Sequence, residues 1–97
     1  MLGASEINVV EGRLRGLFPD LAIRVNAAGR EQFLRRQMAA AKVNGIESSN
    51  DVTLYCGLAI LHGEQFADVS PWLEMLARVR TGSAVFSEEV LVAEEQL

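Results

Sequence analysis

The 97-residue chain contains one cysteine, one histidine and no pattern of residues that marks a catalytic pair. With Cys56 as its single thiol, it can form neither an internal disulfide nor a thiolate metal cluster. His62 follows six residues later, so on a helix the two side chains point to different sides. We therefore interpret Cys56 as a buried small hydrophobe and His62 as a residue near a helix end.

The short motifs that signal common catalytic and cofactor sites are also missing. The sequence has no GxxxxGK[ST], GxGxxG, HExxH or CxxC. Paired carboxylates do occur, but adjacent residues on a helix point about 100° apart and are typical of a solvated face. We predict that the protein is not an enzyme and that it has no cofactor and no metal site.

Long apolar runs are absent, since the longest extends only from Leu54 to Leu61. A transmembrane helix needs about 20 apolar residues. The first residues, MLGASEINVVEGR, do not show a positive segment followed by an apolar one, as a signal peptide would. We expect a cytoplasmic protein without membrane association.

Charge is unevenly distributed along the chain. The net charge of -4 argues against nucleic-acid binding. Residues 1–46 carry seven basic and four acidic side chains, a net charge of +3, whereas residues 47–97 carry two basic and nine acidic ones, a net charge of -7. The simpler interpretation is two solvated faces of opposite sign; the alternative is that these halves contact a partner or each other.

Helical patterns dominate what is present, and the central one is residues 51–62. This segment is apolar on almost every face, so other helices must surround it. Ser48, Ser49 and Asn50 offer N-caps, and His62-Gly63 provides a stop. We expect it to be the hub of the fold.

Two neighbouring segments have one apolar face each. Residues 27–43 are predicted to be a helix that Asn44-Gly45 ends, with an apolar face of Phe33, Leu34, Met38 and Ala41. Ser70-Pro71 should cap and open another helix, in which Glu74 and Arg78 can pair and whose apolar stripe is Trp72, Met75, Leu76 and Val79.

The two ends of the chain are less uniform. Residues 1–17 favour a helix capped by Ser5, with a short strand at residues 7–10 as the alternative, and residues 21–25 favour an extended segment before a cap at Asn26. Residues 84–97 are predicted to be a helix, either closing the bundle or ordering on a partner. Overall we predict one all-α domain, 1–97, with four to five helices around residues 51–62.

Candidate binding residues lie in the basic half and in the acidic C-terminal segment. Tyr55, Phe66 and Trp72 fall on apolar stripes and are interpreted as core. The candidates for contacting a partner protein are two arginines of residues 27–43 and six residues of the C-terminal segment: Arg35, Arg36, Phe86, Glu88, Glu89, Leu91, Glu94 and Glu95.

A resemblance covers roughly residues 30–80. It is carried by Gly45-Ile46, Asn50-Asp51-Val52, Leu54-Tyr55, Leu58-Ala59, His62-Gly63, Phe66 and Pro71-Trp72. This pattern resembles the helical region of small accessory proteins of bacterial type VI secretion clusters, including the C-terminal part of effector adaptors. The chain is too short to carry the larger domain of a full adaptor.

The resemblance implies a non-enzymatic co-chaperone or co-adaptor that binds an effector, an adaptor or a spike component. The alternative is a small immunity or regulatory protein that masks a toxin or partner with its acidic C-terminal segment. A homodimer is a further possibility, because the opposite charges of the two halves permit a two-fold pairing.

Overall fold

The computed structural model describes residues 4–17 and 27–95, in which helices are joined by short turns and no strand occurs. The elements, in chain order, are α1 (Ala4–Leu17), α3 (Ala27–Val43), α4 (Ser49–His62), the 3-10 turn η1 (Phe66–Asp68), α5 (Trp72–Arg80) and α6 (Phe86–Glu95). The prediction of a small all-α bundle is confirmed.

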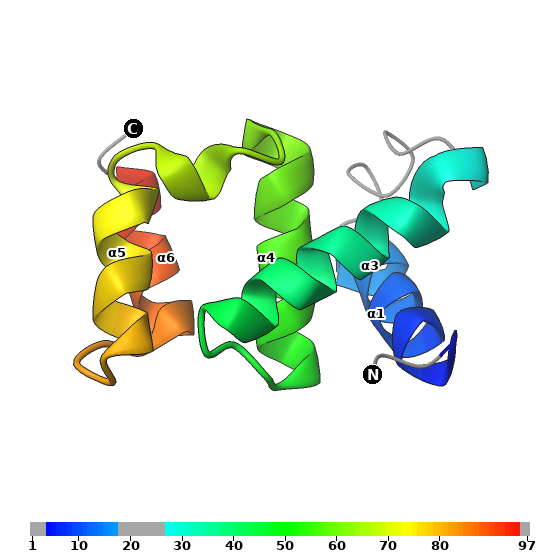
Figure 1. Ribbon diagram of the computed structural model, residues 1–97, viewed down its shortest axis with the longest axis horizontal. Helices are drawn as coiled ribbons and strands as arrows, with labels where there is room; N and C mark the ends of the chain where they lie inside the picture. The colour runs from blue at the N-terminus through cyan, green and yellow to red at the C-terminus, as the bar shows by residue number, and fades with distance from the viewer. Residues whose placement is uncertain (1–3, 18–26, 96–97) are drawn as a thin grey trace.

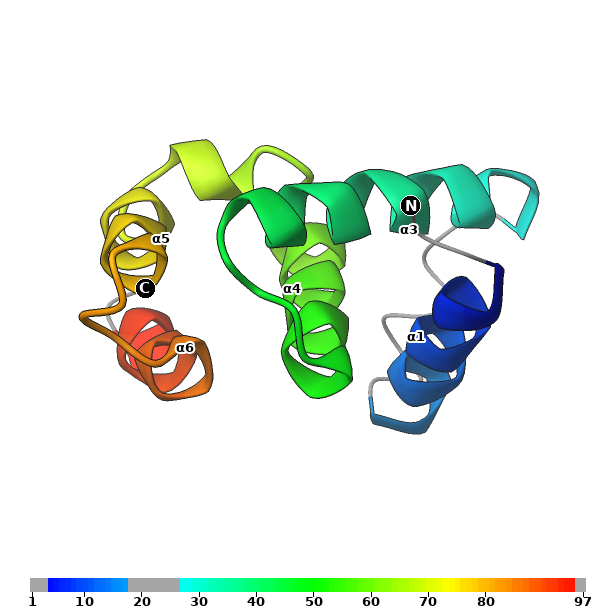
Figure 2. The same ribbon diagram turned by 60° about the horizontal axis from the view of Figure 1, so that its bottom comes forward.

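Helix α4 stands in the middle of the bundle, between α1 and α3 on one side and α5 and α6 on the other (Figure 1). The turned view shows the same order, with η1 leading from the end of α4 to α5 (Figure 2). Because α4 is apolar all round, it must be covered on several faces, and seven of its side chains or backbone positions are buried: Val52, Thr53, Tyr55, Cys56, Gly57, Leu58 and Ala59.

Aromatic rings connect α4 to the elements that follow it. The Tyr55 ring lies 5.0 Å from Phe66 of η1 and 6.3 Å from Phe86 of α6, between ring centroids. Phe66 in turn meets Trp72 of α5 edge to face at 5.7 Å. All four side chains are buried, so the interpretation of Tyr55, Phe66 and Trp72 as core residues is confirmed.

The polar start of α4 follows from its sequence. Ser48 is the N-cap, and its hydroxyl accepts a hydrogen bond of 3.2 Å from the backbone N–H of Asp51. Thr53 is fully buried, yet its hydroxyl donates to the Ser49 carbonyl at 2.7 Å. The buried Thr53 hydroxyl therefore has its hydrogen-bond partner within the same helix.

The end of α3 is closed by a glycine in the left-handed conformation. Gly45 has φ of 78°, its N–H donates to the Lys42 carbonyl, and the N–H of Ile46 donates to the Ala41 carbonyl at 2.9 Å. Ile46 and Ala41 are both buried. This is a Schellman motif with its usual apolar contact, as the Asn44-Gly45 stop predicted.

The N-terminal helix α1 is also confirmed, and the alternative of a strand at residues 7–10 is wrong. Val10 and Leu14 are buried one helical turn apart. Ser5 lies inside the helix, which begins at Ala4, and so is not its cap. The extended segment predicted at residues 21–25 and the cap at Asn26 lie outside the described residues.

The start of α5 differs from its prediction. Helix α5 begins at Trp72, and Ser70 forms no capping hydrogen bond to its backbone. The Ser70 hydroxyl instead donates to the Glu74 carboxylate, and this bond is the main reason why the pKa of Glu74 is lowered. Arg78 lowers the pKa of Glu74 only as a minor electrostatic contribution, and its ion pair is with Glu89 of α6 at 3.1 Å in place of the predicted pair with Glu74.

The α3 stop generates a paired stability prediction. Replacing Gly45 with alanine should destabilise the protein by about 1–2 kcal/mol, because the alanine Cβ strains a left-handed residue. Gly12→Ala, in the middle of α1 with nothing within 4 Å of the added Cβ, should stabilise it by up to about 1 kcal/mol. Urea denaturation of both variants measures the free energy of unfolding; equal shifts would contradict the left-handed cap.

Candidate functional site

Helix α6 holds six of the eight predicted binding residues, and the structure divides them among three faces. Its inner face consists of Phe86, Val90 and Ala93, all buried. Phe86 is a correction to the predicted site: only 3% of it is exposed and its ring packs near Tyr55. A partner cannot reach this side chain while α6 is packed on the bundle, so its role is to anchor the helix.

The two flanks of α6 carry Glu89 and Glu94, and both carboxylates contact a side chain of a neighbouring helix. Glu89 accepts a hydrogen bond of 3.1 Å from Arg78 of α5. On the other flank, Glu94 lies 3.1 Å from Nε2 of His62, the last residue of α4, whose ring also lies 5.1 Å from Trp72. These two carboxylates tie α6 to its neighbours, so they are already engaged.

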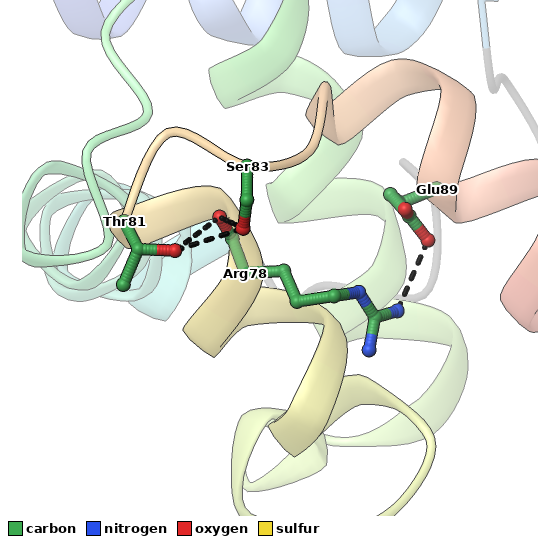
Figure 3. A network of polar contacts seen from close by, with 4 residues as sticks. All are labelled: Arg78, Thr81, Ser83 and Glu89. Carbon is green, nitrogen blue, oxygen red and sulfur yellow. Dashed lines mark hydrogen bonds and ion pairs between the residues drawn. The ribbon is translucent and has the colours of Figure 1, made fainter.

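The turn before α6 also converges on Arg78 (Figure 3). The backbone carbonyl of Arg78 accepts hydrogen bonds from the hydroxyls of Thr81 at 3.0 Å and Ser83 at 3.1 Å, while the Arg78 guanidinium donates to Glu89. The N–H of Ser83 donates to the same carbonyl, and Gly82 takes φ of 79°. One residue thus holds both the end of α5 and the flank of α6.

The third face of α6 points to solvent and consists of Glu88, Leu91, Val92 and Glu95, which we call the α6 outer face. The four positions follow the i, i+3, i+4, i+7 spacing of one helix face, opposite Phe86 and Val90. Leu91 is 69% exposed and Val92 is 49% exposed. No ion pair among the described residues engages either carboxylate.

The α6 outer face thus retains Glu88, Leu91 and Glu95 from the predicted set and adds Val92, which sequence reasoning missed. The signal was present, because Val92 falls four residues after Glu88 and three before Glu95. However, an apolar residue that lies close in sequence to core positions such as Val90 and Ala93 is normally assigned to the core as well. Only the rotation of α6 about its axis shows that Val92 faces away from it.

Arg35 and Arg36 belong to α3 and are not brought together with the α6 outer face. Arg35 pairs with Glu31 one turn earlier at 2.8 Å. Arg36 pairs with Glu64 at 2.6 Å, and this hydrogen bond lowers the pKa of the Glu64 carboxyl and raises that of Arg36. The Arg36–Glu64 pair links the basic half of the chain to the acidic half within one molecule.

Cys56 and His62, the two side chains with the greatest chemical reactivity, both lie in the packed helix α4. Cys56 is fully buried in α4, and burial raises the pKa of its thiol to about 12, so it is protonated at neutral pH. His62 ends α4 as predicted, with Gly63 following at φ of 100°. Within residues 4–17 and 27–95, no cluster of three potential metal ligands occurs and no helix is long and apolar enough to span a membrane.

Comparisons of the chain with protein-family models, with curated proteins and with solved structures give no match. The resemblance to accessory proteins of type VI secretion clusters therefore stays a prediction.

The division of α6 into faces generates a matched pair of mutations. Phe86→Ala should lower the free energy of unfolding by about 3–5 kcal/mol, because it opens a cavity beside Tyr55. Leu91→Ala removes an exposed side chain and should change it by less than about 0.5 kcal/mol. Chemical denaturation followed by tryptophan fluorescence measures both; similar losses in the two variants would show that α6 is rotated differently.

Proposed function

We propose that the protein is a non-enzymatic protein-binding module that contacts its partner through the α6 outer face. The observation that carries this proposal is the exposed pair Leu91 and Val92 between two unengaged carboxylates. The helix beneath them is held by its buried inner face, by the Arg78–Glu89 ion pair on one flank and by the contact of Glu94 with His62 on the other. A helix held in this way loses little conformational entropy when a partner binds, which favours affinity.

The setting that we propose is bacterial type VI secretion, where the protein would act in the cytoplasm as a co-chaperone or co-adaptor for an effector, an adaptor or a spike component. This setting rests on the resemblance of residues 30–80. A small apolar surface on a stable domain supports the binding role, because it can cover an exposed apolar segment of a cargo protein.

A second candidate is an immunity or regulatory protein that masks a basic site on a toxin. Glu88 and Glu95 favour it, because both side chains are exposed and neither forms an ion pair with another described residue. The two candidates differ in which side chains dominate binding. A co-chaperone depends mainly on Leu91 and Val92, whereas a masking protein depends mainly on the two glutamates.

Affinity purification of the tagged full chain from its native host, with mass spectrometry, tests the proposal. We expect a stoichiometric partner that Leu91→Ser/Val92→Ser loses by at least about tenfold, since apolar anchors dominate such interfaces. The matched control is Val43→Ser/Leu61→Ser, because Val43 on α3 is 78% exposed and Leu61 on α4 is 45% exposed.

Three outcomes of this purification are decisive. An effector, adaptor or spike component lost only from the α6 variant supports the co-chaperone. A toxin lost mainly after Glu88→Gln/Glu95→Gln supports the masking protein. Recovery of the chain alone, or equal retention by the α6 variant and its control, contradicts binding through the α6 outer face.

A further inference from the structure

We infer that the α6 outer face takes a cationic amphipathic segment of its partner, with two lysine or arginine side chains on either side of an apolar pair. This inference rests on the proposed function and names the chemistry of the partner. It follows from three features of the face: the spacing of its carboxylates, the absence of ion pairs between them and the rest of the described chain, and the repulsion that a second copy of the same face would meet.

The spacing comes first. Glu88 and Glu95 are seven residues apart, which is two helical turns or roughly 10 Å along α6. Leu91 and Val92 lie midway between them. A helical partner meets this pattern with basic residues at i and i+7 and apolar residues at i+3 and i+4.

The second feature is the uncompensated negative charge of Glu88 and Glu95. The last turn of α6 contains no basic residue, so the Glu95 carboxylate adds to the negative end of the helix dipole. Glu89 and Glu94 already have Arg78 and His62 as partners, whereas Glu88 and Glu95 have no ion pair among the described residues. Cations supplied from outside would complete the charge pattern of this helix.

A second copy of the chain does not supply these cations through the same face. In a two-fold pairing the faces are identical, so Glu88 would meet either Glu95 or Glu88 of the other copy, and the remaining glutamates would likewise meet each other. Like charges across an interface are strongly unfavourable. Arg35 and Arg36 of a second copy already have ion pairs with Glu31 and Glu64.

Anionic lipid surfaces and nucleic acids are disfavoured for the same reason. Both present a high density of negative charge, and residues 47–97 carry a net charge of -7. A basic protein segment is attracted by this charge at a distance and is then held by the apolar pair. The chemistry of the face therefore favours a protein occupant of opposite charge.

The test uses the full chain, labelled with nitrogen-15, and a synthetic helical peptide with lysines at i and i+7 and leucines at i+3 and i+4. The comparison peptide carries glutamine in place of both lysines. Titration to millimolar peptide should shift the amide signals of residues 88–95 selectively. We expect the lysine peptide to bind roughly fivefold to tenfold more tightly than the glutamine peptide, in keeping with two exposed ion pairs.

A double-mutant cycle assigns this difference to the two glutamates. Glu88→Gln/Glu95→Gln should weaken the binding of the lysine peptide by roughly the same fivefold to tenfold. The affinity for the glutamine peptide should not change. The matched control is Glu47→Gln/Asp68→Asn, two exposed acidic residues outside α6, which changes the net charge equally. Circular dichroism of both variants confirms that they are folded.

The inference is overturned if the two peptides bind equally, if the control variant weakens binding as much as the α6 variant, or if no signal of residues 88–95 shifts at millimolar peptide. Self-association of the chain that Leu91→Ser/Val92→Ser abolishes would also overturn it, in favour of a second copy. The proposed function fails separately, when Leu91→Ser/Val92→Ser retains the native partner.

Discussion

A helix that is apolar on every face cannot lie at a protein surface, and this constraint on α4 organises the whole bundle. Tyr55, Cys56 and Leu58 point in different directions around the helix axis, and all three are buried. Helices α1 and α3 contact α4, η1 and α6 cover its other side, and α5 packs on η1 and α6 (Figure 1). Each covering helix turns one apolar face inward, toward α4 or toward an element that is packed on α4.

The surface properties of α6 follow from the same constraint. Phe86, Val90 and Ala93 are drawn inward to α4 and α5, which sets the rotation of the helix about its axis. Once that rotation is set, Glu89 and Glu94 fall beside Arg78 and His62. The remaining positions, Glu88, Leu91, Val92 and Glu95, are exposed. The apolar and acidic side chains of the α6 outer face are therefore together because of the way in which the core is packed.

Much of the fold was predictable because it depends on local chemistry. Ser48 as an N-cap, Gly45 as a left-handed stop and the Trp72 stripe each rest on residues close in sequence. The composition of residues 51–62 also predicted a central helix. Such features need no knowledge of tertiary structure, because capping, backbone conformation and helix periodicity act within a few residues.

The pairing of charges was not predictable in the same way. Arg78 has Glu74 one turn earlier, yet it pairs with Glu89, eleven residues later, because α5 and α6 pack side by side. The hydrogen bond to the Glu74 carboxylate comes from the Ser70 hydroxyl. Phe86 was correctly placed on the apolar side of its helix but was also assigned to partner binding, and only the packing of α6 decides between the two. These choices depend on the angle between helices, which sequence periodicity does not specify.

Native-state hydrogen exchange tests most directly whether α4 is the hub. The backbone amides of Tyr55, Cys56 and Leu58 should exchange only through global unfolding, with a free energy of opening equal to the free energy of unfolding from denaturant titration. Amides of α1 and α6, each of which packs on one side of the bundle, should open at equal or lower free energy. Exchange of the α4 amides at a lower free energy than those of α1 or α6 would contradict the account.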